Sequence, residues 1–344
     1  MWRLRKRKRL QLPLRHRADR RPHATLGLLV FVVAAVLAVR AGIATVKGEK
    51  QDPQSAPQGV RLLYEAPSLI DWTTEDIRAR PELRDLQLAE TQDDLPEMLG
   101  EVGARVRRFF DDFPNTACTE QIRSGPCSMS RGNCVVTFEA QYQYLLLGRP
   151  ANGQRVMTEY RADKRGRPVE TIRTAKGGIE YAPMLTYGFA AAPLLHFHPQ
   201  NGAASRFRYF GRQVVGGIQT EVIGFAEIPG EYCCPAKFHM GNRDVSVFVQ
   251  GLAWVDATTH QILRIRTSLL MPRSDVGLEE QTTQVEFRAI QLPEITTAFW
   301  LPGRVTVDIW FRQGVRRAHF RNTHSYSKFK LFRVTSRIRS GVDK

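Results

Sequence analysis

A two-residue repeat of apolar side chains between residues 135 and 332 is the feature that most constrains the fold. In DVSVFVQGLAWVDATTHQILRIRTSLL, Val245, Val247 and Val249 share one face, and ATTHQ turns the chain into a second strand. This alternation is typical of strands that bury one face. The other segments of this kind are VVTFEAQYQYLLLG, GQRVMTEYRAD, RFRYFG, GGIQTEVIGFAE, TTQVEFRAIQL, PGRVTVDIWFRQ and GVRRAHFRNTHSYSKFKLF. Roughly nine antiparallel strands are therefore predicted, in a sheet that curls into an open or closed barrel.

A helical pattern precedes the strands. In LPEMLGEVGARVRRFFDDF the apolar residues recur at spacings of three and four, which predicts an amphipathic helix. Asp93 and Asp94 are cap candidates, Pro96 suits the first turn and Pro114 ends the helix. Its apolar face is expected to pack on the sheet, with a membrane or partner surface as the alternative. A second helical patch, APMLTYGFAAAPLLHF, lies between strands.

An uncharged stretch near the start indicates a membrane segment. Residues 24–39 carry no charge but span only roughly 24 Å as a helix, whereas residues 24–44 reach roughly 31 Å and can cross a bilayer. Arg40 then lies near the outer end, where its side chain can reach the headgroups. A cleaved signal peptide is the alternative, because Gly42 and Ala44 supply small residues for a cleavage site.

The charge distribution sets the orientation of this segment. Of the net charge of +16, most comes from residues 1–23, which contain many Lys and Arg and one Asp. Such a tail stays in the cytoplasm, so the remainder is expected in the periplasm, or secreted there if the segment is cleaved. The tail suits anionic lipid headgroups, and no nucleic-acid partner is expected. Residues 45–60 form a polar linker, and residues 61–344 a periplasmic domain whose part 61–114 is a helical preface.

The periplasm is an oxidising compartment, in which the five cysteines can form disulfides. Cys118, Cys127 and Cys134 fall in ACTEQIRSGPCSMSRGNC, whose Gly, Pro, Ser and Asn predict a loop that a disulfide could staple. Cys118 with Cys134 or Cys127 is the expected pair. Cys233 and Cys234 are alternative partners, or could form a vicinal disulfide. The spacing does not match a zinc ribbon, and no pair shows C-x2-C.

No motif indicates catalysis. His196 and His198 lie two residues apart and could begin a metal site that His239 or a cysteine completes, or could be unrelated surface histidines. The chain lacks G-x-S-x-G, H-E-x-x-H and a P-loop, and its acidic residues are scattered singly. No metal, cofactor or catalytic residue is therefore assigned, although a metal-dependent hydrolase stays open as a minor alternative.

A family resemblance adds to these predictions. GLAWVDATTHQILRIRTSLL resembles the strand–turn–strand of the LolA/LolB-like superfamily of periplasmic lipoprotein-sorting proteins. The residues that carry it are Ala253, Trp254, Val255, Asp256, Thr259, Ile262 and Arg264, followed by Trp300-Leu301-Pro302. Residues 81–122 also resemble the opening of uncharacterised bacterial envelope proteins. The resemblance implies a mainly β, α+β half-barrel whose concave apolar face holds acyl chains.

The sequence thus predicts a membrane-anchored, non-enzymatic envelope protein that binds a lipid or an acylated protein. The ligand-cavity candidates are aliphatic and aromatic residues of two predicted strands: Val247, Phe248, Val249 and Trp254 of one, and Trp310 of the other. The alternative is an envelope domain with a filled core that docks a protein partner. Nothing in the sequence indicates the oligomeric state.

Overall fold

The computed structural model describes residues 68–129, 132–151, 154–169, 188–229, 236–240 and 243–332. All described residues belong to one compact unit within residues 60–344. The predicted tail, membrane segment and linker lie outside the described residues. Within them, no helix is both long and apolar enough to cross a membrane.

In the described part of the chain, eleven strands form one antiparallel sheet in the order β1-β5-β6-β9-β10-β11-β12-β13-β2-β3-β4. The strands from the amino-terminal half are β1 (Gln87–Leu88), β2 (Thr116–Cys127), β3 (Phe138–Ala151) and β4 (Gln154–Ala162). The later ones are β5 (Ser205–Val215), β6 (Ile218–Glu227), β9 (Val249–Asp256), β10 (Ile262–Leu269), β11 (Leu278–Ile290), β12 (Phe299–Gln313) and β13 (Arg316–Leu331). The two edges, β1 and β4, do not meet, so the sheet is an open half-barrel, as predicted.

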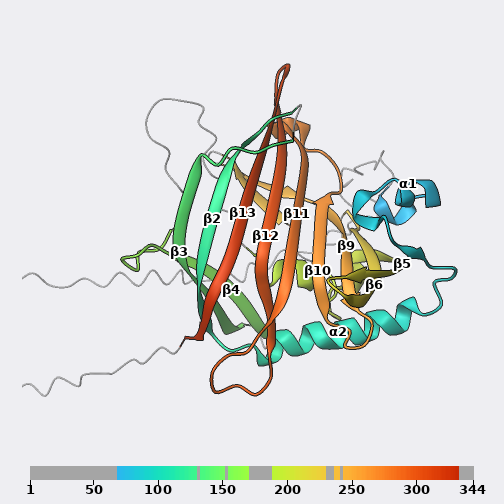
Figure 1. Ribbon diagram of the computed structural model, residues 1–344, viewed down its shortest axis with the longest axis horizontal. Coiled ribbons are helices and arrows are strands. Elements are labelled where there is room, and N and C mark those ends of the chain that lie inside the picture. The colour runs from blue at the N-terminus through green and yellow to red at the C-terminus, as the bar shows by residue number, and fades with distance from the viewer. Residues whose placement is uncertain are drawn as a thin grey trace, which may run out of the picture. The chain divides into compact units, whose positions relative to one another are not determined.

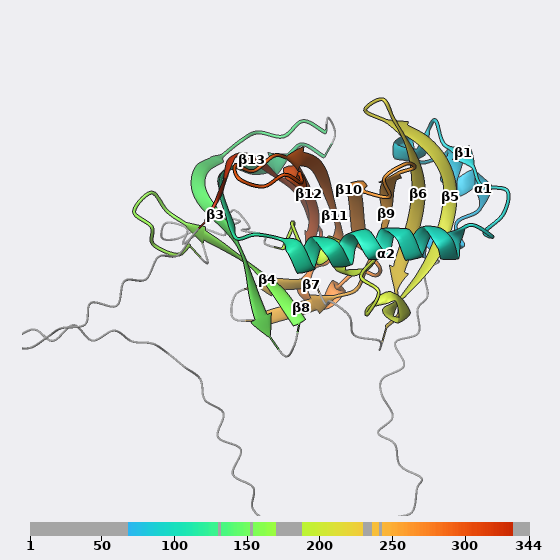
Figure 2. The same cartoon turned by 90° about the horizontal axis from the view of Figure 1, so that it is seen from below.

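The sheet curls because its strands are long and twisted, and Figure 2 shows them as an arc. Most neighbours follow one another along the chain, but β2 pairs with β13 from Thr116↔Leu331 to Cys127↔His319. This pairing joins the chain's first long strand to its last (Figure 1).

Residues 117–134 were predicted to form a loop, and that prediction is wrong for residues 117–127, which belong to a strand. Residues 116–127 form β2, with Cys118, Glu120, Ile122 and Ser124 buried on the inner face. Its Gly125 and Pro126 lie at the hairpin end, where they do not interrupt the apolar row. The disulfide joins Cys127 to Cys134 across this hairpin, so a disulfide within the predicted set is confirmed, but the expected pairing of Cys118 is wrong. Cys118 is a free, buried thiol, and Cys233 and Cys234 lie outside the described residues.

Helix α2 (Leu95–Asp112) confirms the predicted amphipathic helix. It crosses the open side of the arc near one end of the strands (Figures 1 and 2). Val102, Val106 and Phe110 on one side of the helix are buried, while Arg105 and Arg108 on the other are exposed. The predicted second helical patch contains α3 (Ala192–Leu195).

A smaller sheet of β7 (Ala236–Met240) and β8 (Arg243–Val247) lies on the same open side (Figure 2). Residues 245–254 were predicted as one strand, but the chain leaves the small sheet after Val247 and enters the main sheet at Val249. Phe248 is the link between β8 and β9.

Short elements before α2 cover part of the outer face: η1 (Leu69–Asp71), α1 (Thr74–Arg78) and η2 (Pro81–Leu83). Thr73 caps α1, since its Oγ1 accepts from Asp76 N at 3.2 Å while Asp76 Oδ2 accepts from Thr73 N at 2.8 Å. The remaining 3-10 turns are η3 (Gly202–Ala204) and η4 (Ser274–Val276).

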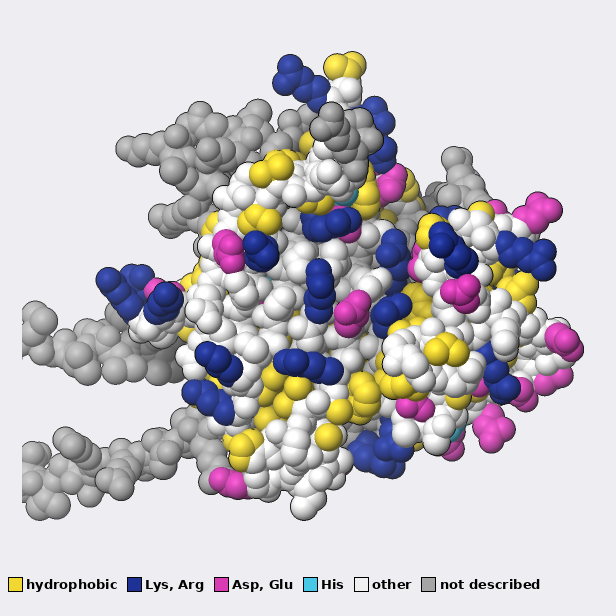
Figure 3. Space-filling model, in the orientation of Figure 1, with side chains coloured by type: hydrophobic (Ala, Val, Ile, Leu, Met, Phe, Trp, Pro, Cys, Tyr) yellow, Lys and Arg dark blue, Asp and Glu magenta, His cyan; other side chains and the backbone are white. Residues whose placement is uncertain are grey.

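Two hydrophobic cores result, one on each face of the sheet. The outer core consists of Leu69, Ile77, Leu83, Phe210, Val222, Leu252 and Trp254. Gly224 makes room for it, because a Cβ there would overlap the Phe210 ring and lie 2.8 Å from Leu69 Cδ1. The larger inner core lies on the concave face, among the sheet, α2, the residues around α3, and β8. On the face that Figure 3 shows, Lys and Arg side chains are scattered singly, with smaller groups of hydrophobic side chains between them.

Candidate functional site

The inner core is the candidate site, because it fills the space that the curled sheet encloses. Its members come from every layer around that space: Val102, Val106, Phe110 and Phe113 from α2 and its end, Phe189, Leu194 and Phe197 around α3, Val245 and Val247 from β8, and Ile223, Phe225, Val285, Val305, Val307 and Ile309 from the sheet. The alternation of the strands places all of the sheet residues on one face. A concave surface lined by aliphatic and aromatic side chains suits an apolar ligand.

Aromatic contacts attach α2 to this core. Phe113 meets Phe299 of β12 edge-on, with ring centroids 5.5 Å apart. Phe110 meets the His198 ring in the same way at 5.8 Å. The helix is also close to the chain after α3, since a Cβ on Gly103 would lie 3.2 Å from Pro199 Cγ.

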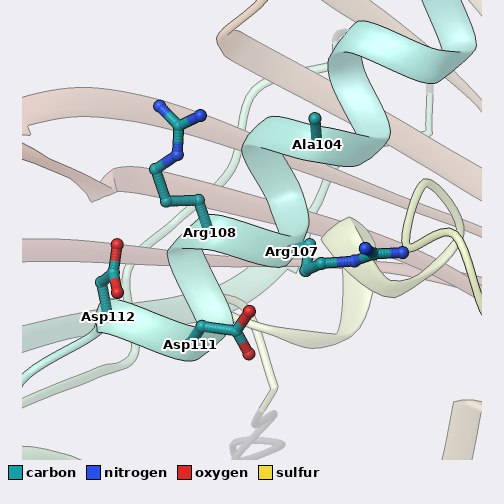
Figure 4. Close-up of a pocket in the computed structure, with 5 residues that line it drawn as sticks. All are labelled: Ala104, Arg107, Arg108, Asp111 and Asp112. Atoms are coloured by element: carbon teal, nitrogen blue, oxygen red, sulfur yellow. The ribbon is translucent and has the colours of Figure 1, made fainter.

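The exposed side of α2 carries a different feature. A shallow depression of about 300 Å³ is lined by Ala104, Arg107, Arg108, Asp111 and Asp112. Figure 4 shows that the four charged side chains extend from successive turns of the helix. Because these groups are hydrated and the depression is open, it is no site for an apolar chain.

The predicted cavity residues do not all belong to the inner core. Val247 and Val249 do, and Phe248 between them is half-buried. Trp254 lies instead in the outer core, because it shares a face with Leu252 and not with Val249. It is fully buried and its Nε1 donates to Gln213 Oε1 at 2.6 Å, so it is not at a rim.

Trp310 is on the outer face of the sheet as well. Its ring stacks on the His319 ring with centroids 4.2 Å apart. His319 Nε2 in turn lies 2.7 Å from Asp308 Oδ1. Cys127 Sγ is close to these two groups, a donor set that could hold a metal ion, but the sulfur is committed to the disulfide with Cys134.

A buried ionic cluster, which the sequence analysis missed, joins side chains of β2, β13 and β4, with β3 between β2 and β4 in the sheet. Glu120 and Arg161 form an ion pair with both side chains fully buried, and Arg161 Nη2 donates to Glu120 Oε1 at 2.7 Å. The same oxygen lies 2.8 Å from His324 Nδ1 and accepts from the Tyr326 hydroxyl at 2.9 Å. The sequence feature that could have indicated this cluster is a charged or titratable residue in the inward row of each strand. Glu120, between Cys118 and Ile122 in that row, is an example.

Electrostatics keep this cluster charged. Burial raises the pKa of Glu120, but the hydrogen bonds from Arg161 and His324 outweigh it and bring the pKa to about 2. Burial lowers the pKa of His324, against the Glu120 carboxylate, which raises it. Because the Glu120 carboxylate accepts from all three partners, it is the centre of this buried polar network.

Glu159 of β4 continues the polar region. Its carboxyl group accepts from the Tyr144 hydroxyl, from Gly188 N at 2.7 Å and from Ala190 N at 3.1 Å. Burial raises the pKa of Glu159. These contacts tie the chain before α3 to β4, so this end of the inner core is held by polar bonds.

His196 and His198 do not converge on a metal site. His196 is buried and stacks on Phe225 with centroids 4.6 Å apart, while His198 packs against Phe110. The side chain of His239 lies outside the described residues. The partner of His196 is Glu227 of β6, whose Oε1 lies 3.8 Å from His196 Nδ1.

No family model and no curated protein matches this chain. Solved structures similar to it include a DUF1329 family protein from Desulfovibrio piger, at 10% identity and a TM-score of 0.36, over 72% of this chain and 94% of that one. A LolA superfamily protein from Nitrosomonas europaea has 11% identity and a TM-score of 0.31, over 69% and 94%. The lipoprotein LppX from Mycobacterium tuberculosis has 10% identity and a TM-score of 0.21, over 68% and 94%.

Breaking the buried ion pair is expected to destabilise the fold strongly. Glu120→Gln leaves the Arg161 charge buried without its counter-charge, and should lower the free energy of unfolding by about 3–5 kcal/mol. Arg161→Met should cost a similar amount. The double variant should lose clearly less than the sum of the two, because no unpaired charge remains. Urea unfolding of the four proteins measures this coupling, and strictly additive losses would contradict the expected charge pairing.

Titration of His196 and Glu227 should affect stability in opposite directions. Burial raises the pKa of Glu227 from 4.5 to about 7, so the folded state binds the proton more tightly and ionisation lowers stability as pH rises through this range. Burial lowers the pKa of His196 from 6.5 to about 4, so its contribution makes stability rise with pH between those values.

The two variants separate these contributions. The stability of Glu227→Gln relative to the unmodified protein should increase from pH 4.5 to 7, by up to about 1.4 kcal/mol per pH unit. That of His196→Gln should decrease from pH 4 to 6.5. Denaturant midpoints across this pH range test both slopes, and two differences that do not vary with pH would refute the assignment.

Proposed function

We propose that this domain binds an apolar chain, such as the acyl chain of a lipid or of an acylated protein, between α2 and the concave face of the sheet. The observation that carries the proposal is the way α2 is held. Its buried side is apolar, and within the described residues one hydrogen bond joins the helix to a strand, from Arg155 Nη1 to Asp111 O at 3.0 Å. The helix can therefore move without breaking a polar network.

Apolar packing makes such an exchange possible. Hydrophobic burial is non-directional, and each CH₂ group of an acyl chain that leaves water contributes about 0.8 kcal/mol. A chain that enters beside Phe109, Phe110 and Phe113 would replace helix contacts with contacts of the same kind. This role requires no catalytic group, and we propose a non-catalytic binding protein of the cell envelope.

A protein-docking or structural role is the second candidate. It is favoured by the inner core itself, in which side chains from α2, the residues around α3 and β8 pack directly against the sheet. If these contacts are permanent, the half-barrel is an ordinary filled core and its partners bind outside it.

One pair of variants separates the two roles. Phe110→Ala removes a ring from the inner core, and Phe210→Ala removes one from the outer core; both rings are buried. Each should lower the free energy of unfolding by about 3–5 kcal/mol. Only Phe110→Ala enlarges the proposed acyl site, so it alone should raise the affinity for a fluorescent fatty acid such as cis-parinaric acid.

The affinity of the two variants for the fatty acid distinguishes the two roles, whereas their free energies of unfolding do not. The unmodified protein should also carry co-purified lipid in native mass spectrometry. Absence of lipid together with equal, negligible binding by both variants would refute the acyl site and leave the docking role.

We further propose that residues 24–44 remain attached as a membrane helix with the amino terminus in the cytoplasm and the domain in the periplasm. The support is the length of the apolar stretch and the basic residues before it. Full-length protein is expected in the membrane pellet after a carbonate wash. A soluble product that begins near Thr45 would show instead that the segment is a cleaved signal.

A further inference from the structure

Three polar side chains lie together inside the inner core, near one end of β5 and β6. Ser205 begins β5 and Glu227 ends β6, and the two are direct cross-strand partners. His196 reaches them from the end of α3 and stacks on Phe225, two residues before Glu227. The exposed fraction is 6% for Ser205, 5% for Glu227 and 3% for His196. Polar groups at this depth require hydrogen-bond partners.

Two of their atoms have none among the described residues. The Ser205 hydroxyl and His196 Nδ1 are buried without a hydrogen bond. The 3.8 Å between His196 Nδ1 and Glu227 Oε1 is too long for one. Glu227 Oε2 accepts from Val249 N at 2.7 Å, which leaves Oε1 to face His196. A buried polar group without a hydrogen bond costs free energy. A ligand group that donates to or accepts from these atoms would remove that cost, so the three side chains are suited to bind a polar group.

The charge of the group restricts that partner. Burial raises the pKa of Glu227 to about 7 and lowers that of His196 to about 4, so at neutral pH the imidazole is uncharged and the carboxyl group is at least partly protonated. Among the described residues, no Lys or Arg forms an ion pair with Glu227. A phosphate or carboxylate would meet a carboxyl group with no cation to offset it. An uncharged hydroxyl can both donate to and accept from these three side chains.

The surroundings connect this group to the proposed acyl site. The Phe197 ring lies 5.5 Å from both the Phe207 and the Phe225 rings, and all three belong to or pack against the inner core. An apolar chain in that core would therefore reach Ser205, His196 and Glu227 at its polar end.

We propose that Ser205, His196 and Glu227 form a head-group subsite that selects lipids with an uncharged, hydroxyl-bearing head group, such as a diacylglycerol, over lipids with an anionic one. This assignment rests on the proposed acyl-binding function and names the ligand class of the same site. The subsite hydrogen-bonds the hydroxyl, while the acyl chain occupies the apolar space beside Phe225.

The test compares two lipids with the same chains. Full-length, delipidated protein is titrated with dioctanoylglycerol and with dioctanoyl phosphatidic acid, each below its micelle concentration, by isothermal titration calorimetry. The unmodified protein should bind dioctanoylglycerol at least about tenfold more tightly. Glu227→Gln should reduce this ratio by improving the binding of phosphatidic acid, and Ser205→Ala should reduce it by weakening the binding of dioctanoylglycerol.

A matched control is Ser325→Ala, which removes an exposed hydroxyl from β13 and should leave the ratio unchanged. The ratio of the two lipid affinities is informative because a loss of stability alone would weaken the binding of both lipids together. Equal affinities, or a preference for phosphatidic acid, would overturn the head-group subsite while the acyl site stands. Failure of both lipids to bind would overturn the acyl site itself and the subsite with it.

Discussion

The pairing of β2 with β13 is the contact on which the rest of the sheet depends. Without it, β2, β3 and β4 would be separated from the meander that runs from β5 to β13, and the sheet would have neither its width nor its curl. The buried ionic cluster lies across this same seam, since Glu120 of β2 binds His324 and Tyr326 of β13 as well as Arg161 of β4. A buried charge tolerates few alternative neighbours, so the cluster favours one register between strands that are distant in the chain.

Much of this architecture could be predicted from local patterns, and the exceptions have physical causes. The period of two predicted most strands and the open curled sheet, and the period of 3.6 predicted α2, because each pattern reflects burial on one side. β2 was missed because its inward row contains Glu120 and Ser124 in place of apolar residues, and its role depends on β13, about two hundred residues away. Trp254 was misplaced because alternation tells which residues share a face but not which face a second core will cover.

The candidate site was less predictable than the fold, since it is assembled from distant segments. Nothing local in LLHFHP indicates that His196 stacks on Phe225 and that His198 packs on α2. The two ends of the inner core also differ in a way that only the assembled structure reveals. The chain before α3 is tied to β4 through Glu159, whereas α2 is held almost entirely by apolar contacts. Movement that admits a ligand is therefore expected at α2.

The inner core contains two buried polar groups, one around Glu120 and one around Glu227. They differ in how far the protein itself supplies their hydrogen-bond partners. Around Glu120 every partner is supplied by the protein, and the low pKa of this carboxyl group records how well its charge is compensated. Around Glu227 compensation is incomplete: His196 stands too far away for a hydrogen bond, the Ser205 hydroxyl has no partner among the described residues, and the pKa rises to about 7. A polar group whose central carboxylate is compensated in this way stabilises a register and does not need a ligand. An unsatisfied one at the polar end of an apolar space retains hydrogen-bonding capacity, and a ligand that brings both an acyl chain and an uncharged hydroxyl would use both parts of the space at once.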